Sequence, residues 1–354
     1  MLEKYYKYKV QYNDYIIFLK FVNFYEVFDN EVKRNTKNKL KVEEFDNYYS
    51  LNIKEIKEEL MSGDYISGEY NIFFIREPKL RIIMSQSIKD KIINHLVARY
   101  FLINVFEKGL IKNNIATRKN KGTHYGLKLF KKYLNIMKHK YNNFYILKFD
   151  ISKYFYNIDH DIVKGLIRNK IKDKKVINIL DNIIDSTDRN YINNRIDKLR
   201  LKEEIPLYRK GKGFPIGNMT SQVFANIYLN ELDHYIKEKL KIKYYIRYID
   251  DGVLIHENKE YLKYCLSEIE RMIEKYKLSL NKKTRIYKMS EGIEFLGFRF
   301  IIKNNKNIMK IKNSTKKRLK KRVNINNMSS YIGHLKHCDC NNLIYRTLKE
   351  KELV

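Results

Sequence analysis

Two short apolar segments that lie far apart in the chain both run directly into aspartate. The first is Phe144 to Phe149, followed by Asp150, and the second ends at Tyr248-Ile249, followed by Asp250-Asp251. A short and nearly all-apolar segment is typical of a strand that is buried on both faces. We therefore expect these carboxylates to lie at the exposed ends of two buried strands.

Carboxylates at neighbouring strand ends repel each other unless a cation lies between them. Mg²⁺ prefers oxygen ligands and is commonly shared with substrate phosphates. Two such ions about 4 Å apart can bind both the attacking and the leaving oxygen of a phosphoryl transfer. Asp150, Asp250 and Asp251 thus form a candidate two-metal site, provided that the two strands are neighbours. The alternative is a simple hairpin turn, because Asp-Gly, here Asp251-Gly252, is a favoured turn pair.

The charge balance points to a polyanionic partner. The chain has 354 residues, with 72 Lys and Arg against 41 Asp and Glu, and a formal net charge of +31. Hydrophobic residues make up 44 % of the chain, so it is a folded protein and not a basic tail. This length suggests two or three structural units. The partner is expected to be nucleic acid or an anionic membrane surface.

Several classes of protein are excluded by other features. Three cysteines are too few for a disulfide framework and fit a reducing cytosol. The segment Met1 to Gln11 is charged and does not read as a signal peptide. The apolar stretch Ile16 to Leu19 ends at Lys20, far short of a membrane span. We therefore expect a cytoplasmic protein with no membrane role.

The periodicity of apolar residues predicts an α+β fold with a ferredoxin-like sheet and helices on one face. Gly211 to Gly217 reads as a loop, because it holds three glycines and a proline. The expected helices are Ser87–Phe106, one that starts near Asp159, Thr220–Leu240 and Glu260–Tyr276. The expected strands are a hairpin over Tyr70–Ile83, then Phe144–Phe149, Lys243–Tyr248, Val253–His256 and a pair within Ile293–Ile302.

Several motifs, taken in order, resemble those of the reverse transcriptases. Tyr248-Ile249-Asp250-Asp251 resembles their Tyr-x-Asp-Asp signature, and Leu147 to Phe155 resembles the motif that bears the first catalytic Asp. The other matching segments, which together cover roughly residues 70 to 340, are Arg76–Arg81 and Arg118–His124 for the fingers, Phe214–Leu229 for the template and nucleotide motif, and Phe295–Phe298 for the primer grip. An ordered set of motifs is far more specific than any one of them alone.

The resemblance implies a right-hand polymerase with a ferredoxin-like palm, fingers and a short helical thumb. The implied divisions are an N-terminal helical extension at 1–60, fingers at 61–145, a palm at 146–300 that includes part of the fingers at 165–212, and a basic thumb at 301–354. Asp150, Asp250 and Asp251 would be catalytic and would hold two Mg²⁺ ions, with Mn²⁺ as an alternative ion. The Ile151 carbonyl would complete one of the metal sites.

The same resemblance assigns nucleotide contacts to six residues. These residues are Lys79, Arg81, Phe155, Ile216, Gly217 and Lys283. Phe155 matches the position whose aromatic ring excludes a ribose 2′-hydroxyl, and the alternative role for it is core packing. Ile216 departs from the many members that carry Gln there, and the loss of that amide predicts relaxed fidelity. Lys79 and Lys283 read equally well as solvated surface lysines.

Primer and template contacts are expected at two further places. Leu296 and Gly297 lie in the segment that resembles the primer grip. A helix beginning near Asn313, capped by Ser314 or Thr315, would present a basic face to the duplex: Lys316, Lys317, Arg318, Lys320 and Lys321. The alternative is a disordered basic segment. His334, His337, Cys338 and Cys340 fit no common zinc-finger spacing, and a packing role is preferred.

The sequence therefore predicts an RNA-directed DNA polymerase that extends a primer 3′ end with dNTPs by two-metal phosphoryl transfer. Its partners would be an RNA template and a DNA or RNA primer, together with a noncoding RNA and an accessory protein if it serves a bacterial retroelement or anti-phage defence system. Two alternatives are open. One is a catalytically silent, basic RNA-binding protein on a polymerase scaffold, and the other is an RNA-dependent RNA polymerase.

Overall fold

Two structural units, each with its own apolar core, make up the chain. The computed structural model describes residues 24–76, 80–199, 205–303, 306–336 and 338–350. The first unit comprises Met1–Ile111, Ile151–Leu232 and Met272–Ser279. The second comprises Lys112–Asp150, Asp233–Arg271 and Leu280–Val354.

The first unit is mostly helical. A two-stranded antiparallel hairpin of β1 (Asn71–Ile75) and β2 (Arg81–Ser85) lies among its helices and confirms the predicted hairpin, although its expected turn around Pro78 lies outside the described residues. The helices before the hairpin are α3 (Phe24–Val27), α4 (Lys39–Asn47) and α5 (Tyr49–Ser62), with a π-helical segment at Phe28–Lys33. Those after it are α6 (Ile88–His95), α7 (Ile103–Phe106), α9 (Tyr154–Asn157), α10 (His160–Arg168), α11 (Lys174–Ile184), α12 (Asn190–Leu199) and α13 (Met219–Tyr228).

The helix starts follow ordinary capping chemistry. The Ser87 side chain accepts a hydrogen bond from the Asp90 N–H at the start of α6, and Asp159 caps α10 in the same way through Ile162. The predicted helix over Ser87–Phe106 is confirmed, with a π-helical segment at Leu96–Leu102 between α6 and α7. The predicted single helix over Thr220–Leu240 is wrong in one respect. It breaks at Leu229, after which α14 (Asn230–His234) and a π-helical segment (Tyr235–Lys239) follow.

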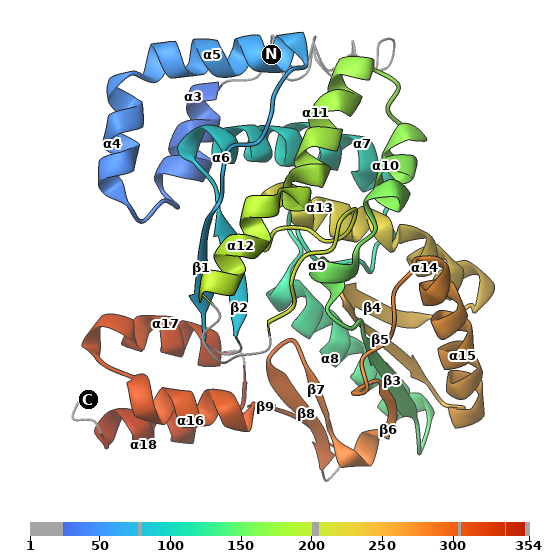
Figure 1. Ribbon diagram of the computed structural model, residues 1–354. Helices are drawn as coiled ribbons and strands as arrows, with labels where there is room; N and C mark the ends of the chain where they lie inside the picture. The colour runs from blue at the N-terminus through green and yellow to red at the C-terminus, as the bar shows by residue number, and fades with distance from the viewer. Residues whose placement is uncertain (1–23, 77–79, 200–204, 304–305, 337, 351–354) are drawn as a thin grey trace. The chain divides into compact units, whose positions relative to one another are not determined.

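The second unit is built on a four-stranded antiparallel sheet. Its strands are β3 (Tyr145–Asp150), β4 (Tyr244–Tyr248), β5 (Asp251–His256) and β6 (Arg285–Lys288), in the order β4-β5-β3-β6. The apolar strand that ends at Asp150, β3, pairs directly with β5, which begins at Asp251 (Figure 1). The second apolar strand of the sequence, β4, is not a direct neighbour of β3, because β5 lies between them. The α+β class and the ferredoxin-like sheet are confirmed. The prediction that helices cover one face of the sheet is wrong, because α8 (Thr123–Lys140) packs on one face and α14 contacts Arg247 on the other.

One face of this sheet packs on helix α8 (Thr123–Lys140). Leu127, Phe130, Leu134 and Met137 of α8 share one apolar core with Ile146 of β3 and its cross-strand partner, Ile255 of β5. Because side chains alternate along a strand, Phe149 and Arg247 lie on the opposite face. The sheet thus separates an apolar face under α8 from a second buried face that carries Arg247.

A second sheet completes this unit. It consists of β7 (Ile293–Phe295), β8 (Phe298–Lys303) and β9 (Lys306–Ile311), and its side chains join the α8 core. The strand pair within Ile293–Ile302 is confirmed, whereas β9 was not predicted. The remaining helices are α15 (Lys259–Lys275), α16 (Asn313–Arg322), α17 (Ile325–Leu335) and α18 (Asn341–Lys349). Among the described residues, no helix combines the length and apolarity that crossing a membrane requires.

Candidate active site

Asp150 and Asp251 meet at the end of the central strands. They are the last register pair of β3 and β5, so the two aspartates face each other across the ladder. Side chains of directly opposed residues lie on the same face of a sheet and close together. The sheet therefore brings two of the predicted catalytic carboxylates to one point, although two like charges there repel each other.

Asp250 lies beside them, in the two-residue turn that joins β4 to β5. Tyr248 pairs with Asp251, which leaves Ile249 and Asp250 as the turn. The hairpin-turn alternative is thus wrong about Asp251 and Gly252, because both residues belong to β5. Gly252 is required for another reason: a Cβ there would lie 2.1 Å from the ring of Phe149, its cross-strand partner.

The turn is conformationally strained. Ile249 has a φ of +56°, in the left-handed region that a β-branched residue rarely occupies. Asp250, the second residue of the turn, does not have a positive φ, and two-residue turns with a positive φ at the first position alone normally carry Gly there. Such a conformation costs on the order of 1–3 kcal/mol and persists only where the surroundings enforce it.

Burial and neighbouring carboxylates alter the proton affinity of Asp250. Desolvation, followed by the charges of Asp251 and Asp150, raises the pKa of its carboxyl from 3.8 to about 7, and a hydrogen bond with the Asp150 carboxyl acts in the same direction. The three acidic groups therefore interact directly. A set of oxygen ligands whose mutual repulsion needs compensation suits Mg²⁺ or Mn²⁺.

The loop before β6 fixes the end of β3. The Asn281 N–H donates to the Asp150 carbonyl at 2.7 Å, and the Asp150 N–H donates to the Thr284 hydroxyl at 3.2 Å. Lys283 lies in this turn with its side chain exposed, next to residues that bind the Asp150 backbone. The Lys148 ammonium, 3.5 Å from an Asp251 oxygen, supplies some positive charge.

The remaining predicted nucleotide contacts belong to the first unit. Gly217, with a φ of +132°, could not become alanine without bringing a Cβ within 3.1 Å of the Met84 carbonyl. The neighbouring Ile216 is half-buried, and its carbonyl accepts a hydrogen bond from the Met84 N–H on β2. Phe155 is half-buried, with its ring centroid 5.8 Å from that of Tyr154.

Two other predicted contacts, one with the nucleotide and one with a metal ion, lie next to the end of a strand. Arg81 is exposed at the start of β2, and the Ile151 side chain is buried just after β3. Lys79 lies outside the described residues.

The predicted primer and template contacts belong to the second unit. Leu296 and Gly297 form the tight β7–β8 turn, both with positive φ. The basic segment after Lys312 is a helix, α16, rather than disordered chain. Neither Ser314 nor Thr315 caps it, because the helix already begins at Asn313. Its lysines at 316, 317, 320 and 321 are exposed, Arg318 is half-buried, and Leu319 is buried in the core.

The C-terminal cysteines show no metal-site features among the described residues. Cys338 and Cys340 are buried free thiols, and the Cys338 thiol donates to the Leu335 carbonyl. Burial raises the pKa of the Cys338 thiol well above its ordinary value, which disfavours the thiolate that zinc binds. His337 lies outside the described residues.

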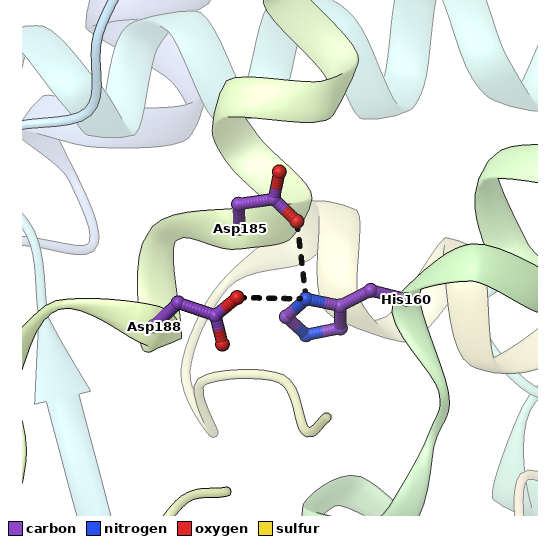
Figure 2. Close-up of side chains that lie close together, drawn as sticks. All are labelled: His160, Asp185 and Asp188. Carbon is purple, nitrogen blue, oxygen red and sulfur yellow. Dashed lines mark hydrogen bonds and ion pairs between the residues drawn. The ribbon is translucent and has the colours of Figure 1, made fainter. Parts of the chain in front are cut away.

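Sequence analysis missed a polar cluster in the first unit, in which the partly exposed Asp185 and Asp188 lie beside the buried His160 (Figure 2). His160 Nδ1 lies 3.1 Å from an Asp185 oxygen and 3.7 Å from an Asp188 oxygen, and its Nε2 lies 2.8 Å from the Gly213 carbonyl. One nitrogen of His160 and one carboxylate oxygen each of Asp185 and Asp188 all lie within 4.8 Å of one another. Such a group of three could hold a metal ion.

The contacts of the cluster account for it without a metal ion. Both ring nitrogens of His160 have a polar partner within the protein, one at the Asp185 carboxylate and the other at the Gly213 carbonyl. The second Asp185 oxygen binds the Lys164 ammonium at 2.6 Å, and Asp188 accepts from the Gly211 N–H. The cluster therefore ties the Gly211–Gly217 loop to α10. The signal in the sequence is weak, since only the Asp159 cap next to His160 marks it.

Comparison with known proteins identifies the family. The family model described as reverse transcriptase (RNA-dependent DNA polymerase) matches residues 76–300, more than half of the chain. This chain belongs to the reverse transcriptase family. The match spans β2, both central strands and the Asp150, Asp250 and Asp251 cluster, so the predicted membership is confirmed.

Individual relatives of this chain are distant. The group II intron-encoded protein LtrA of Lactococcus lactis subsp. cremoris is 27 % identical over 202 residues, which cover 56 % of this chain and 30 % of LtrA. Protein YkfC of Escherichia coli K12 is 23 % identical over 294 residues, 73 % of each chain. The chain thus spans less than a third of the length of LtrA.

Solved structures give weaker matches. An apo telomerase from Candida tropicalis, truncated from its C-terminal domain, has a TM-score of 0.48 and 16 % identity, covering 69 % of this chain and 55 % of the other. A telomerase from Candida albicans in complex with a fragment of telomeric RNA has a TM-score of 0.49 and 12 % identity, with coverages of 87 % and 57 %.

Proposed function

We propose that this chain is an RNA-directed DNA polymerase that extends a primer 3′ end with dNTPs on an RNA template. The observation that carries the proposal is the cluster of Asp150, Asp250 and Asp251 at the end of the central strands, in a chain that belongs to the reverse transcriptase family. The net charge of +31 supports a nucleic-acid substrate.

The three carboxylates would hold two Mg²⁺ ions, with the Ile151 carbonyl as a further ligand. Bound there, the ions would supply positive charge at the primer 3′-hydroxyl and at the leaving pyrophosphate. The protein's own contribution is the placement of the carboxylates. The β3–β5 register sets Asp150 against Asp251, and the β4–β5 turn adds Asp250.

The residues around the carboxylates would bind and select the substrates. Arg81, Lys79 and Lys283 would bind the triphosphate, and the Phe155 ring would exclude a ribose 2′-hydroxyl. Ile216 and Gly217 would contact the nucleotide, and Leu296 and Gly297 the primer. The exposed lysines of α16 would follow the duplex backbone, which is recognised by charge and shape. We assign the extension, fingers, palm and thumb to the residue ranges predicted from the sequence.

The test is primer extension on a defined RNA template with Mg²⁺, comparing dNTPs with rNTPs. We expect extension with dNTPs that is lost in Asp250→Ala. The control Glu260→Ala removes an exposed acid of α15 and should extend normally. A preference for rNTPs would favour an RNA-dependent RNA polymerase, and binding without extension would favour a silent RNA-binding protein.

We propose in addition that the enzyme serves a bacterial retroelement or anti-phage defence system, with a noncoding RNA and an accessory protein as partners. The support is its similarity to an intron-encoded protein and its large positive charge. Sequencing of the RNA that co-purifies with the tagged protein tests this. One dominant RNA species would support a dedicated partner, whereas a sample of total cellular RNA would contradict it.

A further inference from the structure

A buried ion pair lies on the face of the sheet opposite Asp150 and Asp251. Arg247 of β4 and Asp233 of α14 are both fully buried, with 0 % of each side chain exposed. Nε of Arg247 donates to one Asp233 oxygen and its NH2 nitrogen to the other, each at 2.7 Å. The pair is therefore bidentate, the geometry that fixes a guanidinium most firmly.

Asp233 is itself held in place. The Tyr245 hydroxyl donates to one of its oxygens at 2.8 Å, and the Asn114 amide approaches the other at 3.4 Å. The main chain of Arg247 is fixed too, because its N–H donates to the Asn113 carbonyl and its carbonyl accepts from the Ile115 N–H. Both the carboxylate that binds the guanidinium and the main chain that carries it are thus fixed by hydrogen bonds.

The third side of the guanidinium contacts the strained turn. The NH1 nitrogen of Arg247 donates to the Ile249 carbonyl at 2.7 Å. A peptide unit is planar, so the orientation of the Ile249 carbonyl also sets the orientation of the Asp250 N–H. The direction in which the chain enters Asp250 is thereby tied to Arg247.

The hydrogen bond from Arg247 can stabilise a backbone conformation that Ile249 does not favour. Ile249 has a φ of +56°, where β-branched residues are strained and glycine is not. A buried ion pair is weak evidence for a stabilising role, because the free energy lost when two charges leave water can equal the free energy gained from their attraction. A role of the Arg247–Asp233 pair in orienting the strained turn explains its presence better.

We propose that Arg247, anchored on Asp233, is a positioning residue that holds Ile249 in its left-handed conformation and so aims the Asp250 carboxylate at the reaction centre. The inference rests on the proposed polymerase function. It assigns catalytic importance to a side chain that lies on the other face of the sheet and that does not touch the substrate.

The test is a double-mutant cycle of Arg247→Lys and Ile249→Gly. Lysine keeps the charge opposite Asp233, but its single nitrogen cannot serve both carboxylate oxygens and the Ile249 carbonyl. We expect Arg247→Lys to lower kcat on the order of 10²-fold, as for a misplaced catalytic group, with KM for the dNTP little changed. In the Ile249→Gly background the same substitution should cost at least about fivefold less in kcat, because glycine adopts a positive φ without help.

A second readout is independent of turnover. The Mg²⁺ concentration that half-saturates the thermal shift of the protein should rise in Arg247→Lys and fall back toward the wild-type value in the double variant. Tyr245→Phe, which removes one support of Asp233, is a milder variant that should shift both readouts in the same direction. Tyr65→Phe removes a buried hydroxyl bonded to Asp90 in the first unit, and should lower Tm without changing either readout.

The outcomes separate the two proposals. If the wild-type protein extends no primer with dNTPs, the proposed function fails, and the Mg²⁺ titration still tests the positioning role. If the wild type extends primers but the effects of Arg247→Lys and Ile249→Gly simply multiply, the ion pair only stabilises the fold and the inference is overturned.

Discussion

Asp150 and Asp251 face each other as the last pair of the β3–β5 ladder, with Asp250 in the adjoining turn. Like charges directly opposite one another destabilise a sheet. The carboxylates that the proposed chemistry needs therefore repel one another in the absence of a metal ion. This repulsion should lower the stability of the metal-free protein.

The first prediction concerns Asp250→Asn. The substitution removes a buried charge that Asp150 and Asp251 oppose, so the metal-free protein should become more stable while primer extension is lost. Tm at pH 8 in EDTA should rise by about 2–4 °C for each kcal/mol of relieved repulsion. Thermal unfolding checks this, and a lower Tm in EDTA would contradict it.

The second prediction concerns pH. The folded-state pKa of Asp250 is raised to about 7 from an ordinary value of 3.8, so the native state binds more protons than the unfolded state between these values. Stability from this group is present below pH 3.8 and is lost as pH rises toward 7. In EDTA, the Tm of the wild type relative to Asp250→Asn should fall between pH 5 and pH 8, and Mg²⁺ should restore it most at pH 8. A pH-independent difference would argue against the coupling.

The third prediction concerns Gly252→Ala. A Cβ at this position would lie 2.1 Å from the Phe149 ring, so the ring or the strand that carries it must shift. Overpacking of this kind costs about 1–3 kcal/mol, and chemical denaturation should show a loss in that range together with reduced extension. Gly165→Ala is the matched control, because a Cβ there meets nothing within 4 Å inside α10, and it should stabilise by about 0.5–1 kcal/mol. Equal effects at both positions would be inconsistent with the proposed packing.

The fourth prediction concerns Ile216→Gln. The Ile216 side chain is half-buried while its carbonyl is fixed by the Met84 N–H, so a longer polar side chain can be placed without moving the loop. An amide near the nascent base pair should lower misincorporation severalfold on a defined template. Sequencing of the products measures this, with the rate of correct incorporation as a control. An unchanged error spectrum would count against a role for this position in fidelity.

The fifth prediction concerns α16. Replacing Lys317 and Lys321, both exposed and one turn apart, with Gln should weaken binding of an RNA–DNA duplex. The slope of log affinity against log salt should become shallower by about one per lost phosphate contact. Lys259→Gln with Lys263→Gln on α15, exposed at the same spacing, is the matched control and should change the slope less. Equal changes would mean that α16 has no special role.

The sequence alone determined the local features. The apolar runs before Asp150 and Asp250 indicated β3 and β4, since a short and nearly all-apolar segment is typical of a buried strand. The Ser87 and Asp159 caps placed the starts of α6 and α10. The ordered motifs identified the family before any pairing was known, because each is a short contiguous segment.

Only the tertiary structure decided how distant residues combine. The register that sets Asp150 opposite Asp251, and the choice of Ile249-Asp250 rather than Asp251-Gly252 as the turn, depend on which strands pair. The links from Arg247 to Asp233 and from His160 to Asp185 were equally invisible, because a buried charge is satisfied by whatever group the fold brings beside it. Local propensity acts over a few residues, whereas the energies that place these side chains arise from contacts between segments that the sequence keeps apart.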